Sequence, residues 1–442
     1  MPSLSRRTFL QQLAAGAVTA PFITRGLMAQ SPNSVVHHAT FGTAGMALAD
    51  VRAIAKHPAV KVVAGCDVDA KRTAEFLKLF PDARIYSDYR ELLAKEKDLQ
   101  SVNVSTPDHM HAPIGLAALD RGLHVYGQKP LTHDIFESRR LTEYAREKNA
   151  VTQMGIQIHS NTEYRTGVQL VQSGAIGKIR EVHTWSSKAW GDTGAKPDRE
   201  DPVPEGLDWP LWIGVCTDRP YIKGWYHPGD WRRRLDFGTG TFGDMGCHIY
   251  DPVFKALALT APITVRSEGA APNEHSWATD AVIHYVFPGT QFTEGKTVNV
   301  TWYDGSKRPP EAINALAVSG DKKAPDQGSI FIGTEGVMVL PHVGKPRLVG
   351  EKVAGLKFEM VPGEDHWQQF INAVLGKGKA SANFDYAGPL TEAILLGSVA
   401  TRFPQQTLEW DAASLKFKNV GDANKFVRIP YREGYKVPGI KA

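Results

Sequence analysis

The chain has 442 residues, which is too long for one compact core, so we expect at least two structural units. Its 51 basic and 47 acidic residues give a formal net charge of +4, and no concentrated basic stripe points to a nucleic-acid partner. The three cysteines, Cys66, Cys216 and Cys247, lie far apart and make neither a disulfide framework nor a zinc site, so no bound metal is expected.

Residues 1–29 have the parts of a twin-arginine signal peptide. The pair Arg6-Arg7 precedes a modestly apolar stretch over 13–23, and the small residue Ala29 suits cleavage. The stretch is too short for a stable membrane span, and no other segment looks transmembrane. We therefore expect the Tat export machinery as a partner and a periplasmic or otherwise exported protein. An N-terminal amphipathic helix is the alternative interpretation.

The next segment predicts the start of a Rossmann domain. A strand over 35–41 runs into Gly42-Thr43-Ala44-Gly45-Met46 and a helix, and a second strand over 61–66 ends at Asp67. Glycines let the backbone approach a pyrophosphate, the helix N-terminus stabilises its charge, and the acid accepts hydrogen bonds from the adenosine ribose. Because Asp67 would repel a 2′-phosphate, the pattern favours NAD over NADP.

Strands and helices continue to alternate, which predicts an NAD-binding domain over 33–155 with a parallel sheet. The expected helices and strands cover 70–80, 83–86, 89–95, 101–105, 113–121, 124–126 and 151–157. Two of these strands end in polar motifs, Thr106-Pro107 with His111, and Gln128-Lys129-Pro130. Ligands of open parallel sheets bind at the carboxyl ends of the strands, so both motifs should face the cofactor.

Residues 156–442 predict a second, α+β unit with a mainly antiparallel sheet. Its expected strands, several of which alternate between apolar and polar residues, cover 179–186, 263–268, 281–287, 297–302, 329–332 and 337–340. His159, Tyr164 and Arg165, near its start, are candidate substrate-binding residues. Two amphipathic helices are expected near the C-terminus, over 365–375 and 388–401.

A long irregular segment over 189–243 is rich in Gly, Pro, Trp and Arg. Loops of this length in a compact enzyme are usually functional or disordered, and the aromatic content argues against disorder. Trp231 and Arg232, with the nearby Trp225-Tyr226-His227, are therefore candidates for a substrate rim, with the indoles stacked on a sugar face. The alternative is that these aromatic side chains only anchor the loop.

Three motifs together resemble the Gfo/Idh/MocA sugar oxidoreductases, which include glucose-fructose oxidoreductase and inositol dehydrogenase. They are Thr106-Pro107 with His111, Lys129-Pro130, and the run from Gly243 to Asp251, and the resemblance extends from about residue 35 to 400. It implies a second domain that binds substrate and forms a homo-oligomer, a dimer or tetramer, with C-terminal helices packed back on the Rossmann domain. The family usually carries Glu-Lys-Pro, so Gln128 departs from the pattern while the catalytic lysine is kept.

Asp244 and His248 stand at i and i+4 within the third motif, so on a helix they share one face. The carboxylate would then hold the imidazole or bind a substrate hydroxyl. Pro252 removes the backbone donor that would reach the His248 carbonyl, which predicts a kink that aims the imidazole into the cleft. A plain surface pair is the alternative, and a metal site lacks a third ligand at a convincing spacing.

The resemblance assigns these residues to hydride transfer. Oxidising a sugar carbinol needs a base at the hydroxyl, and we expect His248 to be that base, Lys129 to polarise the same oxygen, and Asp244 to orient His248 or bind a neighbouring hydroxyl. Whether Lys129 or His248 takes the proton stays open, because the two would titrate as a coupled pair.

Three functions fit these expectations. The first is an exported NAD-dependent oxidoreductase that acts on a sugar or glycoside CH–OH and holds its cofactor tightly, because Tat transport carries folded proteins and NAD is not freely exchanged outside the cytoplasm. The second is a redox-neutral glycosidase or lyase that oxidises its substrate transiently, eliminates the leaving group and returns the hydride. The third is a non-catalytic sugar-binding protein on the same fold.

Overall fold

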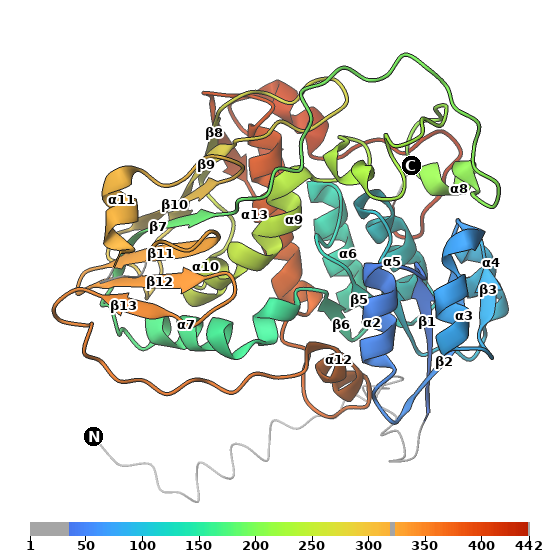
Figure 1. The fold of residues 1–442 in the computed structure, drawn as a ribbon, viewed down its shortest axis with the longest axis horizontal. Coiled ribbons are helices and arrows are strands. Elements are labelled where there is room, and N and C mark those ends of the chain that lie inside the picture. The colour runs from blue at the N-terminus through green and yellow to red at the C-terminus, as the bar shows by residue number, and fades with distance from the viewer. Residues whose placement is uncertain (1–34, 319–322, 441–442) are drawn as a thin grey trace, which may run out of the picture.

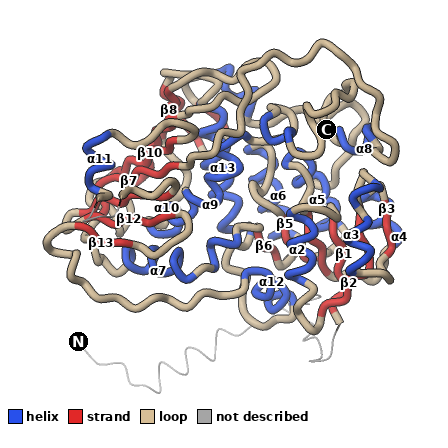
Figure 2. Tube along the Cα trace, viewed as in Figure 1, coloured by secondary structure: helices blue, strands red, loops and turns tan. Residues whose placement is uncertain are grey.

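The computed structural model describes residues 35–318 and 323–440 (Figure 1). The expected signal peptide, residues 1–29, lies outside this part of the chain, as do the first two residues of the expected 33–155 domain. Across the described ranges, no helix is long and apolar enough to cross a membrane. Two sheets with helices packed around them lie side by side (Figures 1 and 2).

The first sheet has six parallel strands in the order β3-β2-β1-β4-β5-β6. Their bounds are β1 (Val36–Phe41), β2 (Val60–Cys66), β3 (Arg84–Tyr86), β4 (Ser101–Val104), β5 (His124–Gly127) and β6 (Thr152–Met154). The direction of winding reverses between β1 and β4, and such a switch point opens a crevice at the carboxyl ends of the strands. Phe41 pairs with both Cys66 and Val104, so the segments after these three strands begin at the same edge.

Five helices flank this sheet (Figure 1). They are α2 (Met46–Ile54), α3 (Ala74–Leu79), α4 (Tyr89–Lys95), α5 (His111–Asp120) and α6 (Ile135–Glu147). The helix expected over 70–80 is broken, because the Asp69 side chain accepts the Lys71 N–H and starts a separate 3-10 turn at Ala70–Arg72. Helix α6 was missed, although Asp134 and Glu137 form a capping box that marks its start.

The second sheet has nine strands in the order β13-β12-β11-β7-β10-β9-β8-β14-β15. Their bounds are β7 (Ile179–Trp185), β8 (Thr264–Glu268), β9 (Val282–Pro288), β10 (Thr297–Tyr303), β11 (Gly328–Gly333), β12 (Val337–Pro341), β13 (Arg347–Val349), β14 (Thr407–Asp411) and β15 (Lys416–Phe417). Strands β7 and β10 pair in parallel, and the other neighbours are antiparallel. The predicted fold class is therefore confirmed, while β13 to β15 were not expected.

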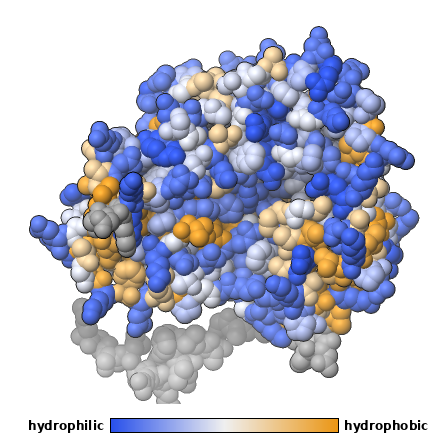
Figure 3. Space-filling view, in the orientation of Figure 1, coloured by the Kyte–Doolittle hydropathy of each residue, from blue (hydrophilic) through white to orange (hydrophobic). Residues whose placement is uncertain are grey.

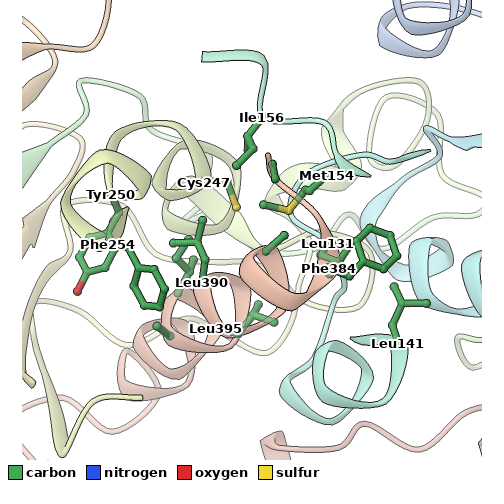
Figure 4. Packing of buried hydrophobic residues seen from close by; sticks show 14 of the residues in the cluster. Leu131, Leu141, Met154, Ile156, Cys247, Tyr250, Phe254, Phe384, Leu390 and Leu395 are labelled. Atoms are coloured by element: carbon green, nitrogen blue, oxygen red, sulfur yellow. The ribbon is translucent and has the colours of Figure 1, made fainter. Parts of the chain in front are cut away.

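The remaining α-helices are α7 (Thr162–Gln172), α8 (Trp209–Ile213), α9 (Gly240–Ile249), α10 (Asp251–Ala256), α11 (Glu311–Leu316), α12 (His366–Val374) and α13 (Phe384–Ala400). Helix α13 is buried on nearly every side, as expected of a helix that is apolar all round. It contacts α6 of the first unit and α9 of the second, and α12 contacts α2. Figure 4 shows Leu390 and Leu395 of α13 near Cys247 and Tyr250.

This packing joins the two units through one continuous apolar core. The face of the molecule in Figure 3 is mostly hydrophilic, and its apolar residues form separate patches. Helix α13 packs against both α9 and α6 of the first unit. This packing fixes the position of α9 relative to the carboxyl edge of the first sheet. That edge and α9 build the candidate site.

Candidate active site

A cavity of about 430 Å³ lies at the carboxyl ends of β1, β2, β4 and β5, between the first sheet and the second unit. Fourteen residues proposed from the sequence line it: Gly42, Ala44, Gly45, Met46, Asp67, Thr106, Pro107, His111, Gln128, Lys129, Trp231, Arg232, Asp244 and His248. The cavity therefore brings together the cofactor motifs of the first unit and the catalytic candidates of both. Among the described residues, no group of three His, Cys, Asp or Glu side chains is placed to hold a metal ion.

The turn after β1 has no room for a side chain at Gly42. Gly42 has φ of +92°, and a Cβ there would lie 2.8 Å from the Ser105 carbonyl oxygen and 2.9 Å from the Ala47 Cβ. Gly45, with φ of +59°, precedes the first turn of α2. Left-handed backbone costs glycine little, so the turn approaches the helix N-terminus closely. This cradle fits a dinucleotide pyrophosphate.

Asp67, just after β2, is held in place by Thr43. The Thr43 backbone N–H and its Oγ1 hydroxyl each donate to Asp67 Oδ2 at 2.9 Å, and the Asp69 N–H donates to Oδ1 at 3.1 Å. Thr43 is fully buried behind the cavity and does not line it. Its part is to orient the carboxylate that the sequence predicts to bind ribose.

His111 ties the two polar strand-end motifs to each other. Its Nδ1 lies 2.7 Å from the Pro130 carbonyl oxygen and its Nε2 lies 2.7 Å from the Thr106 carbonyl oxygen. Carbonyl oxygens only accept, so the ring donates to at least one of these loops. The buried imidazole thus keeps the segment that carries Lys129 against the end of β4.

Lys129 and Asp244 form an ion pair across the two units. Lys129 Nζ donates to Asp244 Oδ1 at 2.5 Å and to the Asp244 carbonyl oxygen at 3.0 Å, and Arg232 Nε lies 3.6 Å from the same Oδ1. Burial alone raises the pKa of the Asp244 carboxyl, but the charge and hydrogen bond of Lys129, with the charge of Arg232, lower this pKa to about 2. Asp244 therefore stays ionised at neutral pH.

His248 follows Asp244 by one turn of α9 and is partly exposed toward the cavity. Burial lowers the pKa of His248 well below its ordinary 6.5, and the charge of Lys129 lowers it further. The imidazole is therefore neutral at neutral pH, with a lone pair free to accept a proton. Asp244 directs its carboxylate to Lys129, so the expectation that it orients His248 is not what the structure shows.

The helix does break where proline predicted a kink. Helix α9 ends at Ile249, and α10 begins at Asp251 with Pro252 in its first turn. Proline has no N–H to donate and suits the first turn of a new helix. The break leaves His248 in the last turn of α9, facing the cavity.

Trp231 anchors its segment and also lines the cavity, and Arg232 lines the cavity beside it. Trp231 belongs to an aromatic cluster with Trp209 and Trp212, which anchors the segment, and it also lines the cavity. The Arg232 guanidinium lies 4.3 Å from the centre of the Trp231 ring and faces Asp244. The cavity wall therefore contains an indole and a cation beside the Lys129–Asp244 pair.

Three substrate-binding candidates lie outside the cavity. His159 is buried, with Nδ1 2.8 Å from Asp251 Oδ2, and the Tyr164 ring packs 4.8 Å from the His159 ring. Arg165 pairs with Glu364 at the surface. These residues were proposed from their place at the start of the second unit, but the residues that face the cavity come from later in the chain.

Several cavity residues were not predicted. Arg72, Trp212 and Tyr435 line the cavity, and outside it His342 lies beside His248 with the ring centres 5.8 Å apart. They are far apart in the sequence and belong to no motif. His227 also lines the cavity, and the sequence had offered it as part of a substrate rim.

Two family models match the chain. Residues 36–156 match "Oxidoreductase family, NAD-binding Rossmann fold", and residues 161–309 match "Oxidoreductase family, C-terminal alpha/beta domain". The described edge of the first sheet, with its glycine turn and Asp67, lies within the first match.

Curated relatives match over part of their length. Levoglucosan dehydrogenase of Pseudarthrobacter phenanthrenivorans is 29% identical over 194 residues, which are 44% of this chain and 41% of the relative. Inositol 2-dehydrogenase of Salmonella typhimurium is 32% identical over 127 residues, 28% of this chain and 37% of the relative. The chain thus spans less than half the length of these relatives.

Solved structures share the fold at low identity. A WlbA dehydrogenase from Bordetella pertussis, solved with NADH and UDP-GlcNAcA, superposes with a TM-score of 0.61 at 14% identity, covering 85% of this chain and 99% of that one. An aldose-aldose oxidoreductase from Caulobacter crescentus, solved with glycerol, gives 0.58 at 14% identity, covering 85% and 100%. With both family models matched in order along the chain, this protein belongs to the Gfo/Idh/MocA oxidoreductase family and has an NAD-binding Rossmann domain.

Proposed function

We propose that this protein is an exported oxidoreductase that oxidises a CH–OH group of a sugar or glycoside with an NAD that it holds tightly. The observation that carries the proposal is that Lys129, Asp244 and His248 meet in the cavity that the glycine turn and Asp67 also line. Bound NAD would supply the hydride acceptor. The names of the relatives, levoglucosan and inositol dehydrogenases, support a polyhydroxylated substrate.

The side chains divide the work at the substrate oxygen. The ammonium of Lys129, held by Asp244, polarises the hydroxyl oxygen and stabilises the charge that develops there. The neutral His248 accepts the hydroxyl proton, because its lowered pKa keeps its lone pair free. Arg232 and the Trp231 indole lie beside this pair and offer a hydrogen-bond donor and a flat apolar surface to the rest of the ring.

Tight binding of NAD is supported by a segment over 204–237, which we call the aromatic strap. It crosses from the second unit onto the end of β2: the Ala70 N–H donates to the Gly206 carbonyl at 2.8 Å, and the Asp208 N–H donates to the Val68 carbonyl at 2.8 Å. His227 Nε2 lies 2.9 Å from Asp69 Oδ2. In Figure 1, α8, which belongs to this segment, is drawn above α4 of the first unit.

The strap lines the same end of the cavity as Asp67, with Trp212, His227 and Pro228. A ligand seated on Asp67 would be covered by these side chains, and its release would require the strap to lift. An exported protein gains from such an enclosure, because a lost cofactor is not replaced outside the cytoplasm.

The enclosed cofactor also favours a second candidate, a redox-neutral glycosidase or lyase. Oxidation of a ring hydroxyl to a carbonyl makes the neighbouring C–H acidic. Loss of that proton expels the leaving group and leaves a carbon–carbon double bond. In a glycosidase water then adds across this bond, whereas in a lyase it stays, and return of the hydride would regenerate the hydroxyl and NAD, so no external oxidant is needed. Lys129 and His248 would serve this cycle as they serve a simple oxidation.

Product analysis tests both functions. The purified full-length protein is denatured and its supernatant assayed for NAD, and the native protein is incubated with a panel of sugars and aryl glycosides whose products are identified by mass spectrometry. Bound NAD with a keto sugar supports the oxidoreductase. Release of the phenol without net NADH supports the redox-neutral cycle. No change in any substrate would overturn both and leave a sugar-binding protein.

A further inference from the structure

A buried carboxyl group lies behind the candidate active site and is not part of the mechanism above. Asp50, on α2, is fully buried. Its Oδ2 accepts hydrogen bonds from the Ser105 hydroxyl and from Gln128 Nε2, both at 2.9 Å, and its Oδ1 accepts one from Trp367 Nε1 at 2.9 Å. These three donors offset the free-energy cost of burying the carboxyl, because a buried acid is unfavourable unless it is hydrogen-bonded.

Gln128 connects this carboxyl group to Lys129. While its Nε2 donates to Asp50, its Oε1 accepts the Lys129 backbone N–H at 3.0 Å. The amide packs closely against Gly155, where any Cβ would lie 2.6 Å from Gln128 Nε2. Asp50 therefore sets the orientation of the amide. Because the carboxylate only accepts, the NH2 group of Gln128 turns toward Asp50, and its oxygen then faces the Lys129 N–H.

Gln128 thus holds the backbone of Lys129, from which the side chain that forms the ion pair extends. From this fixed backbone the ammonium reaches Asp244 of the second unit. Trp367, on α12, also comes from the second unit, so Asp50 bonds to both units at once. A shift of the Gln128 amide would move the base of the lysine while its tip stays bound to Asp244.

We propose that Asp50 is a positioning residue for the reaction, acting through the Gln128 amide on the backbone of Lys129. The inference rests on the proposed function, in which Lys129 polarises the substrate oxygen. It adds a group that contacts neither substrate nor cofactor.

The charge of Asp50 fits this role. Burial raises the pKa of Asp50 to about 6, against the opposing effect of its hydrogen-bond donors. At neutral pH the group is mostly the carboxylate, which only accepts, and only an acceptor holds the Gln128 amide in the orientation seen. As the pH falls through 6, the added proton turns one oxygen into a donor and weakens that constraint.

Exchanging the two functional groups tests the inference. In Asp50→Asn, the amide oxygen accepts from the fixed Trp367 indole and the new NH2 faces Gln128. The Gln128 amide then flips to offer its oxygen to position 50, which turns its NH2 toward the Lys129 N–H and removes that acceptor. In the double variant Asp50→Asn/Gln128→Glu, the new carboxylate at position 128 accepts from both the Lys129 N–H and the amide now at position 50. The oxygen of that amide accepts from Trp367. The same groups are present in exchanged positions, and the acceptor for Lys129 is restored.

We expect Asp50→Asn to lower kcat about tenfold with little change in KM or in NAD content, and the double variant to recover most of that loss. Trp367→Phe is the matched control, because it removes one donor to Asp50 and leaves the Gln128 contact; its kcat should stay near wild type. If Asp50→Asn folds poorly, the double variant and Trp367→Phe still carry the comparison.

A second measurement needs no substrate. Hydrogen exchange of the Lys129 amide reports the Gln128 contact directly, so exchange should be faster in Asp50→Asn and slow again in the double variant. If the exchange follows this pattern while the wild type oxidises no sugar, the positioning role stands and the proposed function fails. If the double variant exchanges as fast and turns over as slowly as Asp50→Asn, the positioning role is overturned.

Discussion

Lys129 and Asp244 come from different structural units and meet through an N–O contact of 2.5 Å in the active-site cavity. Lys129 follows β5 of the NAD-binding domain, and Asp244 lies on α9 of the second unit, which α13 clamps from behind. The ion pair therefore depends on how the two units dock. The hydrogen bond of the Asp244 carboxylate goes to Lys129, while its charge also raises the pKa of His248 against the larger effect of burial.

Removing the charge of Asp244 should lower kcat without releasing the bound NAD. Asp244→Asn keeps the shape of the side chain but leaves the Lys129 ammonium without its counter-charge, so we expect kcat to fall roughly 100-fold or more. NAD content should not change, because the glycine turn and Asp67 remain. Steady-state kinetics and NAD assay of the denatured protein measure the two effects. Near-normal kcat would remove Asp244 from the mechanism.

The pH dependence of catalysis identifies the base. His248 acts in its neutral form, and its pKa lies well below 6.5, so kcat/KM should stay flat as the pH falls from 8 through 6.5. Loss of rate should begin only below pH 6.5, where Asp50, with a pKa of about 6, and then His248 take up protons. A fall in kcat/KM centred at 6.5 or above would contradict this assignment. His248→Ala should abolish turnover while NAD stays bound.

Weakening the aromatic strap should release NAD. In Asp69→Ala, the contact with His227 is lost, and we expect NAD to dissociate roughly tenfold faster, as for the loss of one charge-assisted hydrogen bond. The rate is measured by trapping released NAD with an excess of an NAD-binding enzyme. Lys352→Ala is the control, because Lys352 pairs with Glu335 at the surface of the second unit, outside the strap and the cavity. Equal rates of NAD dissociation from wild type and Asp69→Ala would show that the strap does not retain NAD.

His366 should make the fold sensitive to acid. It is buried, with Nε2 donating to the Met154 carbonyl and Nδ1 accepting from the Ser160 hydroxyl, and burial lowers its pKa to about 4. The unfolded chain, with a pKa near 6.5, binds the proton first as the pH falls. The contribution of His366 is therefore complete above about pH 7 and falls by roughly 3 kcal/mol between pH 6.5 and 4.

The variant His366→Gln isolates this contribution. Glutamine offers one donor and one acceptor but does not titrate in this range. We expect the free energy of unfolding of the variant, measured with urea, to lie below that of wild type at pH 8 and to approach it as the pH falls to 5. A difference that stays constant with pH would show that His366 does not control the acid sensitivity.

Much of the site was predictable because local chemistry marks it. The order and spacing of strand, turn and helix mark the glycine turn and Asp67, and the resemblance of their motifs to the family marks Lys129 and the Asp244/His248 pair. The missed helix α6 was marked by its capping box. The unpredicted strands β13 and β15 are two or three residues long, too short for an alternating pattern to be recognised.

The amino-acid sequence by itself determined the order of elements, the family resemblance and fourteen of the residues that line the cavity, because each depends on neighbours along the chain. Only the tertiary structure decided which of those residues touch. The pairing of Asp244 with Lys129, the burial of His159 away from the cavity and the Asp50–Gln128–Lys129 chain join segments far apart in sequence. Such contacts are set by the packing of α9, α12 and α13 against the first unit, which no local pattern encodes.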